Sequence, residues 1–279
     1  MRTIAFLTPY RHLPSFSNKV SEHYNCLDLS DLTDLEQQEL LKTCDYVFAA
    51  PNYINYTLTE EMIKGGNVKK IISPSTGLNH IEITSIPTIH IKNDPVLKDI
   101  WSTAEHNLYL LLKVCREPNT SIAELHSKNL GILGYGRLGS MVKKLTRPLF
   151  NKVYTMDKDH NKPEFFKEID FLSINVDLND TTKEFINKRF LKKFKKKLFI
   201  VNTSRGEVIN EKDLKTLLEK REVLGYATDV IQDEHTASES VLKNKKIKNV
   251  TITPHIGGTA LESQEKAYNR VLEKFEYEK

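Results

Sequence analysis

The chain has 279 residues, which is about two domains at roughly 150 residues each. Hydrophobic residues make up 39% of the chain, enough for a packed core, and the longest purely apolar stretch around Leu108–Leu112 is far shorter than the roughly 18 residues of a membrane span. A net charge of +4, carried mostly by Lys and not by Arg, gives no argument for a nucleic-acid partner. Disordered chains and integral membrane proteins are therefore excluded as classes.

The N-terminal residues predict no targeting segment. Only four apolar residues, Ile4–Leu7, stand together, too few for a signal-peptide core. We therefore expect a cytoplasmic protein. Three widely spaced cysteines, Cys26, Cys44 and Cys115, suit neither a disulfide framework nor a metal site.

The opening third alternates short apolar runs with polar segments. A helix is expected near Leu32–Lys42. Strands are expected at Thr3–Leu7, Tyr46–Ala50, Lys70–Ser73 and Thr88–Ile91. This alternation predicts a small α/β lobe with a parallel sheet.

A second and longer series follows the apolar helix pattern of Trp101–Arg116, which we expect to pack between lobes or subunits. Six strands are predicted, LGIL, VYTMD, DFLSINV, LFIVNT, LGYATDV and NVTITP. The helices between them are expected at Gly136–Leu145, Thr181–Lys192 and Glu211–Lys220. Six such strands make a complete nucleotide-binding sheet.

The last helical pattern covers Thr259–Lys279. Its apolar residues recur at helical spacing, which predicts a single buried face made of Tyr268, Val271, Leu272 and Phe275.

A glycine motif opens the second series. Gly134, Gly136 and Gly139 stand in G-x-G-x-x-G register after a strand and at the start of a helix, the context in which this motif binds the pyrophosphate of a dinucleotide. Asp157 ends the next strand 18 residues later, where a carboxylate accepts from the ribose hydroxyls and favours NAD over NADP. The alternative is ordinary turn chemistry, with Asp157 capping a helix or pairing with Lys158.

Three polar residues follow later strands of the same sheet. They are Arg205 in VNTSRGEVIN, Glu234 in GYATDVIQDEH and His255 in VTITPHIGG. Open α/β sheets bind ligands at this edge. Chemistry on a 2-keto or 2-hydroxy acid needs a cation for the carboxylate, a proton donor for the carbonyl oxygen and a carboxylate that holds the donor protonated, and these residues supply the three parts.

Each of these residues also has a structural interpretation. An Arg after a strand is often a surface ion pair, although the glycine after Arg205 leaves backbone room for a ligand. Glu234 is flanked by two further polar residues, one of them His235. We interpret His80 and His106 as packing or surface histidines.

With these motifs the sequence resembles the D-isomer-specific 2-hydroxyacid dehydrogenase family over most of its length. The matching blocks are SPSTGLNHIEI, STAEHNLYLLL, GILGYGRLGS, FLSINVDLNDTT, FIVNTSRGEVIN, GYATDV and TPHIGG. The resemblance implies two Rossmann-like lobes with doubly wound parallel sheets. An NAD-binding domain over 101–258 is inserted into a smaller flavodoxin-like, substrate-binding lobe, 1–100 plus 259–279, with the active site in the cleft between them.

The resemblance also implies roles for individual residues. Arg205 would bind the substrate carboxylate and carbonyl oxygen, Glu234 would pair with the imidazole, and His255 would be the acid/base. The substrate carboxylate would lie on the backbone amides around Thr76, Gly77 and Leu78. The cofactor contacts implied, besides the glycines and Asp157, are Thr103, Arg137, Leu138, Thr203 and Asp229, the last on the nicotinamide side.

Three departures from the family pattern stand out. The helix that usually follows the N-H-I-E block has no room, and the connection after Arg116 is shorter than the arm that usually embraces a second subunit. A homodimer is still expected, because helix 101–116 is so apolar. The usual L-H-x-P-L block reads I-N-V-D-L, with Asn175 and Asp177 substituted, which changes contacts near the adenosine.

Two other functions remain open at this point. The same fold also serves as a catalytically silent, NAD-sensing corepressor, although Arg205, Glu234 and His255 together argue against loss of catalysis. A sugar epimerase would want a Tyr-x-x-x-Lys pair, which does not follow the glycine motif. The substrate side chain is not predicted, and the residues expected near it are Tyr53, Asn55, Tyr56 and Ser75.

Overall fold

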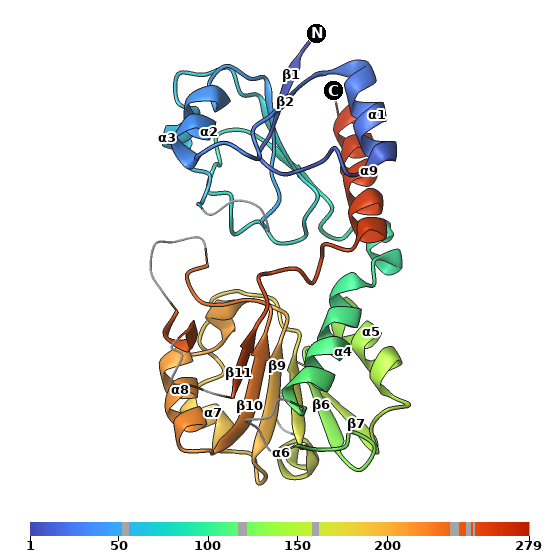
Figure 1. Ribbon diagram of the computed structural model, residues 1–279, viewed down its shortest axis with the longest axis vertical. Helices are drawn as coiled ribbons and strands as arrows, with labels where there is room; N and C mark the ends of the chain where they lie inside the picture. Colours follow the sequence, from blue (N-terminus) through green and yellow to red (C-terminus); the bar gives the residue numbers. More distant parts are fainter. Residues whose placement is uncertain are drawn as a thin grey trace. The chain divides into compact units, whose positions relative to one another are not determined.

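The computed structural model describes residues 1–51, 56–116, 122–157, 162–234, 240–243, 247 and 249–278. The chain divides into two compact units, 1–100 with 259–279 and 101–258 (Figure 1). Each unit is built around one parallel sheet with helices, so the chain has the predicted α/β class.

The sheet of the first unit has the strand order β2-β1-β3-β4-β5, and every neighbouring pair is parallel. This is the flavodoxin-like doubly wound order. Its strands are β1 (Thr3–Phe6), β2 (Asn25–Asp28), β3 (Tyr46–Phe48), β4 (Lys70–Ser73) and β5 (Thr88–His90). The apolar runs of β1, β3 and β4 are largely buried, as expected for strands covered on both faces.

The helices of this unit come from both ends of the chain. They are α1 (Pro14–His23), α2 (Asp34–Leu41), α3 (Glu60–Ile63), the short 3-10 helix η1 (Pro95–Asp99) and the C-terminal α9 (Leu261–Tyr277). In Figure 1, α9 runs beside α1. The predicted buried face of α9 is confirmed, because Tyr268, Val271, Leu272 and Phe275 all lie in the core with Phe16 and Phe48.

The second unit has a six-stranded parallel sheet in the order β11-β10-β9-β8-β6-β7. Its strands are β6 (Asn129–Leu133), β7 (Lys152–Met156), β8 (Phe171–Ile174), β9 (Leu198–Asn202), β10 (Val223–Thr228) and β11 (Val250–Ile252). After β6 the chain crosses first to β7 and then back to β8. The carboxyl ends of β6 and β8 therefore form the switch point at which such sheets bind ligands.

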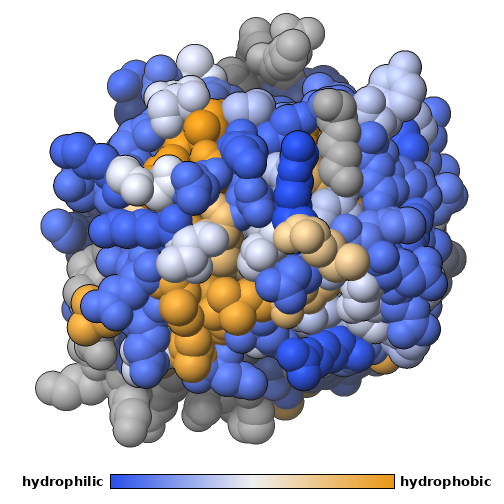
Figure 2. All heavy atoms as spheres, turned by 90° about the horizontal axis from the view of Figure 1, so that it is seen from above, coloured by the Kyte–Doolittle hydropathy of each residue, from blue (hydrophilic) through white to orange (hydrophobic). Residues whose placement is uncertain are grey.

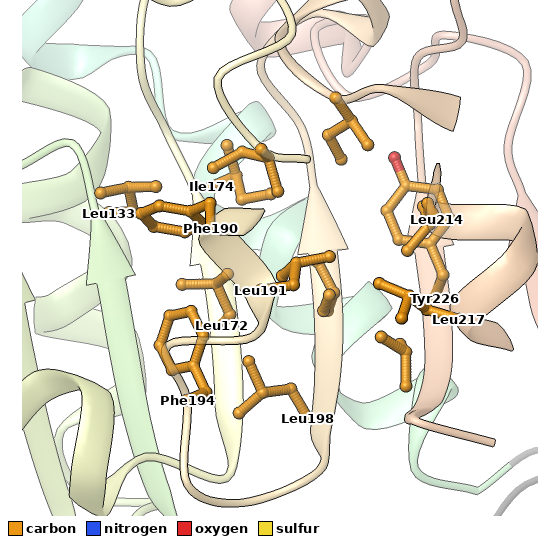
Figure 3. Close-up of a cluster of buried hydrophobic side chains, with 14 of the residues drawn as sticks. Leu133, Leu172, Ile174, Phe190, Leu191, Phe194, Leu198, Leu214, Leu217 and Tyr226 are labelled. Carbon is orange, nitrogen blue, oxygen red and sulfur yellow. The ribbon is translucent and has the colours of Figure 1, made fainter. Parts of the chain in front are cut away.

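Helices cover both faces of this sheet. They are α4 (Ser102–Val114), α5 (Arg137–Thr146), α6 (Pro163–Glu168), α7 (Lys188–Leu191) and α8 (Glu211–Glu219), with the 3-10 turns η2 (Gly206–Val208) and η3 (Val241–Lys243). Figure 3 shows one of the two cores, in which Leu172 and Ile174 of β8 lie among Phe190 and Leu191 of α7. The other core joins the sheet to α4 and α5.

The helix predicted over Thr181–Lys192 is wrong in extent. Residues 181–184 form turns, Ile186 makes a bridge with Ile209, and only α7 is helical. The Asn187 side chain accepts from the Phe190 amide and so begins the helix there. The predicted elements also omit β2, α1, α3 and α6.

The surface shown in Figure 2 is mostly hydrophilic, with hydrophobic residues gathered in patches. Across the described ranges, every helix is too short or too polar to cross a bilayer. The same residues contain no group of three or more His, Cys, Asp or Glu side chains arranged to hold a metal ion.

Candidate functional site

The glycine loop connects β6 to α5. Gly134 has φ of 87°, and a Cβ there would lie 2.7 Å from the backbone of Asn175. A Cβ on Gly139 would lie 2.0 Å from the carbonyl oxygen of Gly134, so only glycine lets helix and loop pack this closely. At Gly136 a Cβ would meet open space, which leaves its backbone accessible to a ligand.

This loop fits the pyrophosphate of NAD. The N-terminus of α5, a helix of 10 residues, opens at Arg137 directly after the accessible glycine, and its amides and dipole favour an anion. Burial lowers the pKa of Arg137, and the charge of Asp177 opposes that shift. Leu138 packs against the core between α5 and the sheet, so its side chain serves structure.

The carboxylate expected for the ribose lies at the end of the neighbouring strand. Asp157 follows β7 directly, and its side chain is exposed. Strand, glycine loop, helix and acidic strand end therefore occur in the arrangement that NAD requires. The alternative partner Lys158 lies outside the described residues.

Glu234 and His255 meet beyond the carboxyl ends of β10 and β11. His255 Nδ1 lies 2.9 Å from Glu234 Oε2, and both side chains are mostly buried. Arg205 follows β9, and burial lowers its pKa while the charges of Glu234 and Glu207 oppose that shift. The carboxylate of Glu234 therefore contacts the His255 ring and also acts electrostatically on Arg205, and the three predicted residues are brought together within one unit.

The glycine after Arg205 has a different reason from the predicted one. A Cβ on Gly206 would lie 1.9 Å from the carbonyl carbon of Ile231 and 2.3 Å from the amide of Gln232. The segment that carries Arg205 is thus packed directly on the segment that leads to Glu234. The glycine permits contact between two backbones and does not leave room for a ligand at this position.

Asp229, at the end of β10, holds the turn that carries His255. Its carboxylate accepts from the amides of Ile256 (2.9 Å) and Gly257 (2.7 Å) and from Thr253 Oγ1 (2.6 Å). Burial alone would raise the pKa of Asp229, but hydrogen bonds from His106 and Thr253 hold it below its usual value. These donors engage both oxygens of Asp229. The contact that we expected between Asp229 and the nicotinamide side of the cofactor stays a prediction.

His106 of α4 belongs to this network, which sequence reasoning missed. Its Nε2 lies 2.9 Å from Thr253 Oγ1 and 3.2 Å from Asp229 Oδ1. The packing role that we expected for His106 is therefore incomplete. The available signal was the position of His106 one helical turn after Thr103, whose methyl group would lie 3.6 Å from a Cβ on Gly257.

Thr203 lies in a second buried network. Its Oγ1 accepts from Asn107 Nδ2 (2.9 Å), Asn107 Oδ1 accepts from Ser173 Oγ (3.0 Å), and Asn175 Nδ2 donates to Ser173 Oγ (2.9 Å). Thr203 is 6% exposed. Through these hydrogen bonds its side chain connects the end of β9 to α4 and β8. The substituted Asn175 is tied to the same sheet edge as the glycine loop.

The loop after β4 in the first unit contains the predicted carboxylate cradle, Thr76, Gly77 and Leu78. The Gly77 amide donates to Ser75 Oγ at 3.3 Å. Below the loop, His80 is fully buried with Nε2 3.4 Å from Ser73 Oγ, in agreement with a packing histidine.

Of the residues expected near the substrate side chain, Tyr56 is already engaged in the first unit. Its hydroxyl donates to Gln37 Oε1 at 2.6 Å, and burial raises its pKa. Gln37 in turn donates to the Leu29 carbonyl oxygen, which fixes the pair within the fold. Tyr53 and Asn55 lie outside the described residues.

Comparisons with known proteins show which family and which fold this chain is similar to. Residues 101–257 match the family model of the D-isomer specific 2-hydroxyacid dehydrogenase, NAD binding domain. The chain is 29% identical to a hydroxypyruvate reductase of Thermotoga maritima (86% of this chain, 87% of that protein) and 27% identical to a glyoxylate reductase of Thermococcus litoralis (95% and 90%). Its fold is similar to that of NAD+-bound 3-phosphoglycerate dehydrogenase of Entamoeba histolytica, with a TM-score of 0.80, 24% identity and coverage of 98% and 94%.

Proposed function

Because the chain belongs to the D-isomer specific 2-hydroxyacid dehydrogenase family, we propose that it transfers a hydride between NAD(H) and C2 of a small D-2-hydroxy acid or the matching 2-keto acid. The family match supports an oxidoreductase with an NAD-binding domain. The single observation that carries the finer proposal is the contact of His255 with Glu234 at 2.9 Å, near the half-buried Arg205.

His255 is proposed as the general acid in the reductive direction. Glu234 engages Nδ1, which orients the ring, and Nε2 is proposed as the atom that hands a proton to the carbonyl oxygen. A bound NADH supplies the hydride at nicotinamide C4. In the oxidative direction His255 takes the proton from the hydroxyl group.

Arg205 is proposed to bind the substrate carboxylate and carbonyl oxygen. A guanidinium matches both atoms with a planar pair of donors, and a desolvated one binds an anion more strongly than one in water. Glu234 and Glu207 balance its charge in the absence of substrate. The amides of Thr76, Gly77 and Leu78 are proposed as additional donors to the carboxylate.

The cofactor contacts are proposed residue by residue. The loop amides around Gly136 and the Arg137 guanidinium would hold the pyrophosphate, and the Asp157 carboxylate would accept from the ribose hydroxyls. This assignment rests on the open space at Gly136 and on the exposed carboxylate after β7. Because a carboxylate repels a 2′-phosphate, NADH is the preferred cofactor.

A homodimer through α4 is also proposed. Tyr109 and Leu112, three residues apart on this helix, are 47% and 44% exposed, so they offer two neighbouring large apolar side chains to a partner. Light scattering of the purified protein tests this proposal, and a monomer mass at micromolar concentration contradicts it. The corepressor-like alternative has no support from the relatives described above, whose names are those of enzymes.

The deciding experiment is a panel of small 2-keto acids, including hydroxypyruvate and glyoxylate, assayed with NADH and with NADPH. We expect oxidation of NADH with at least one acid and a weaker reaction with NADPH. Tight binding of NADH without turnover of any acid would contradict the proposed enzyme and leave only a nucleotide-binding protein.

A further inference from the structure

One buried carboxylate of the second unit takes no part in the proposed chemistry. Glu211 is the first residue of α8 and is only 3% exposed. Burial raises its pKa, and the charges of Asp233 and Glu207 add to that effect. Burying a carboxylate costs free energy unless hydrogen bonds compensate it, so the partners of Glu211 define its role.

The hydrogen bonds of Glu211 reach both sides of the segment that contains Glu234. Oε1 accepts from the backbone amide of Gln232 at 2.8 Å, and Oε2 accepts from Ser240 Oγ at 2.5 Å. Gln232 stands two residues before Glu234, and Ser240 stands six residues after it. One side chain therefore ties the chain on either side of the residue that contacts His255.

The same stretch of backbone is held from a second side. Gly206 packs on Ile231 and Gln232 without space for a Cβ, and Gln232 Nε2 reaches Glu184 Oε1 at 3.4 Å. Gln232 thus lies between the N-terminus of α8 and the segment that carries Arg205. Displacement of Gln232 would move Glu234 relative to both His255 and Arg205.

We infer that Glu211 is a positioning residue that holds Glu234 against His255, and so controls turnover without touching substrate or cofactor. The inference rests on the proposed function for the role of Glu234 and His255, and on the two hydrogen bonds for the role of Glu211. Misplacement of a reacting group by about 1 Å costs up to 100-fold in rate, so loss of Glu211 should lower kcat by roughly 10- to 100-fold.

Glu211→Ala and Glu211→Gln separate positioning from fold stability. The alanine variant loses both hydrogen bonds, and we expect the fall in kcat with an unchanged dissociation constant for NADH. The glutamine variant should retain activity within about threefold, because its amide oxygen still accepts from Gln232 and its amide group can donate to Ser240. Equal losses in both variants would overturn the inference.

Asp170→Asn is the matched control. Asp170 is another carboxylate of this unit that accepts from a backbone amide, that of Asn129 at 3.0 Å, but it precedes β8 and so lies at the opposite edge of the sheet. We expect a lower melting temperature and an unchanged kcat in this variant. Should Glu211→Ala fail to fold, Ser240→Ala removes one of the two hydrogen bonds and should still lower kcat.

A double-mutant cycle with Glu234→Gln tests the route of the effect. If Glu211 acts through Glu234, Glu211→Ala causes little further loss of kcat in the Glu234→Gln background, whereas a full additional loss contradicts the inference. Amide hydrogen exchange provides a second test that does not depend on finding a keto acid that the enzyme turns over. The peptide that contains Gln232 should exchange faster in Glu211→Ala than in wild type or Asp170→Asn, and unchanged exchange would overturn the inference even if no keto acid were turned over.

Discussion

At His255 the backbone enters the left-handed region, with φ of 54°. This conformation costs roughly 1 to 2 kcal/mol for a residue with a Cβ, so neighbouring contacts must hold it. Asp229 supplies them, because it accepts from the amides of Ile256 and Gly257 directly after His255. The backbone strain lies at the residue proposed to transfer the proton, and the turn directs its imidazole toward Glu234.

Replacement of His255 by alanine should lower kcat by about 100- to 10,000-fold, the range typical of a lost general acid. The affinity for NADH should not change. Steady-state kinetics together with a fluorescence titration of NADH measure the two effects. His126→Ala, a change at an exposed histidine, is the control. Full turnover in the His255 variant would remove it from the mechanism.

Arg205→Lys should mainly weaken binding of the keto acid. An ammonium group cannot form the paired hydrogen bonds of a guanidinium, so we expect the KM for keto acid to rise roughly tenfold or more. The KM for NADH should stay the same. Arg189→Lys, at an exposed position, provides the comparison. An unchanged KM for the keto acid in the Arg205 variant would argue against the assignment.

At the scale of elements, the site is assembled where strand ends meet α4. Asp229 directly follows β10, Thr253 and His255 follow β11, and His106 comes from α4. Ser102 Oγ donates to the carbonyl oxygen of Gly257 at 2.7 Å, a further bond between helix and turn. Burial of this network under α4 explains why its single carboxylate accepts from several donors at once.

Asp229→Asn should lower the free energy of unfolding of the second unit by about 2 kcal/mol near neutral pH, since an amide replaces a buried charged acceptor. The folded-state pKa of Asp229 is depressed, so its stabilising contribution is present above the unfolded value of roughly 3.9 and is lost as the pH falls through the folded value.

Urea unfolding at several pH values tests this dependence. The difference in stability between wild type and Asp229→Asn should be largest near neutrality and should shrink below about pH 4. Asp180→Asn, at an exposed position, should show no such dependence. A constant difference across the pH range would contradict the charge argument.

At the scale of the whole molecule, the chain leaves its first unit after residue 100 and returns to it at residue 259. The returning helix α9 completes an aromatic cluster. The ring centroid of Phe275 lies 4.7 Å from the ring centroid of Tyr46 and 5.7 Å from that of Tyr24. The first unit therefore depends on residues at both ends of the sequence.

Phe275→Ala should destabilise the first unit by about 3 to 5 kcal/mol, because it empties a fully buried position. Tyr277→Ala, two residues later on the same helix and 93% exposed, should change stability by less than about 0.5 kcal/mol. Thermal unfolding of both variants measures the contrast. Similar melting temperatures for the two would mean that α9 does not complete this core.

Patterns local in sequence predicted much of the fold. Buried parallel strands are continuous apolar runs, so nearly all strands of both units were predicted, and the buried face of α9 followed from its helical spacing. Short or half-exposed elements were not. The strand β2 has only four residues, two of them polar and none fully buried, and α6 has only six residues, so neither produces a clear period.

Residue type and order were sufficient to nominate the glycine loop, Asp157 and the trio Arg205, Glu234 and His255, because each stands at a strand end and carries the group that the chemistry needs. The roles of Gly206, His106 and Glu211 depend on contacts with residues at least 21 positions away in the chain. Only the tertiary structure decides those contacts, since packing between segments, and not the pattern within one, determines which buried group meets which donor.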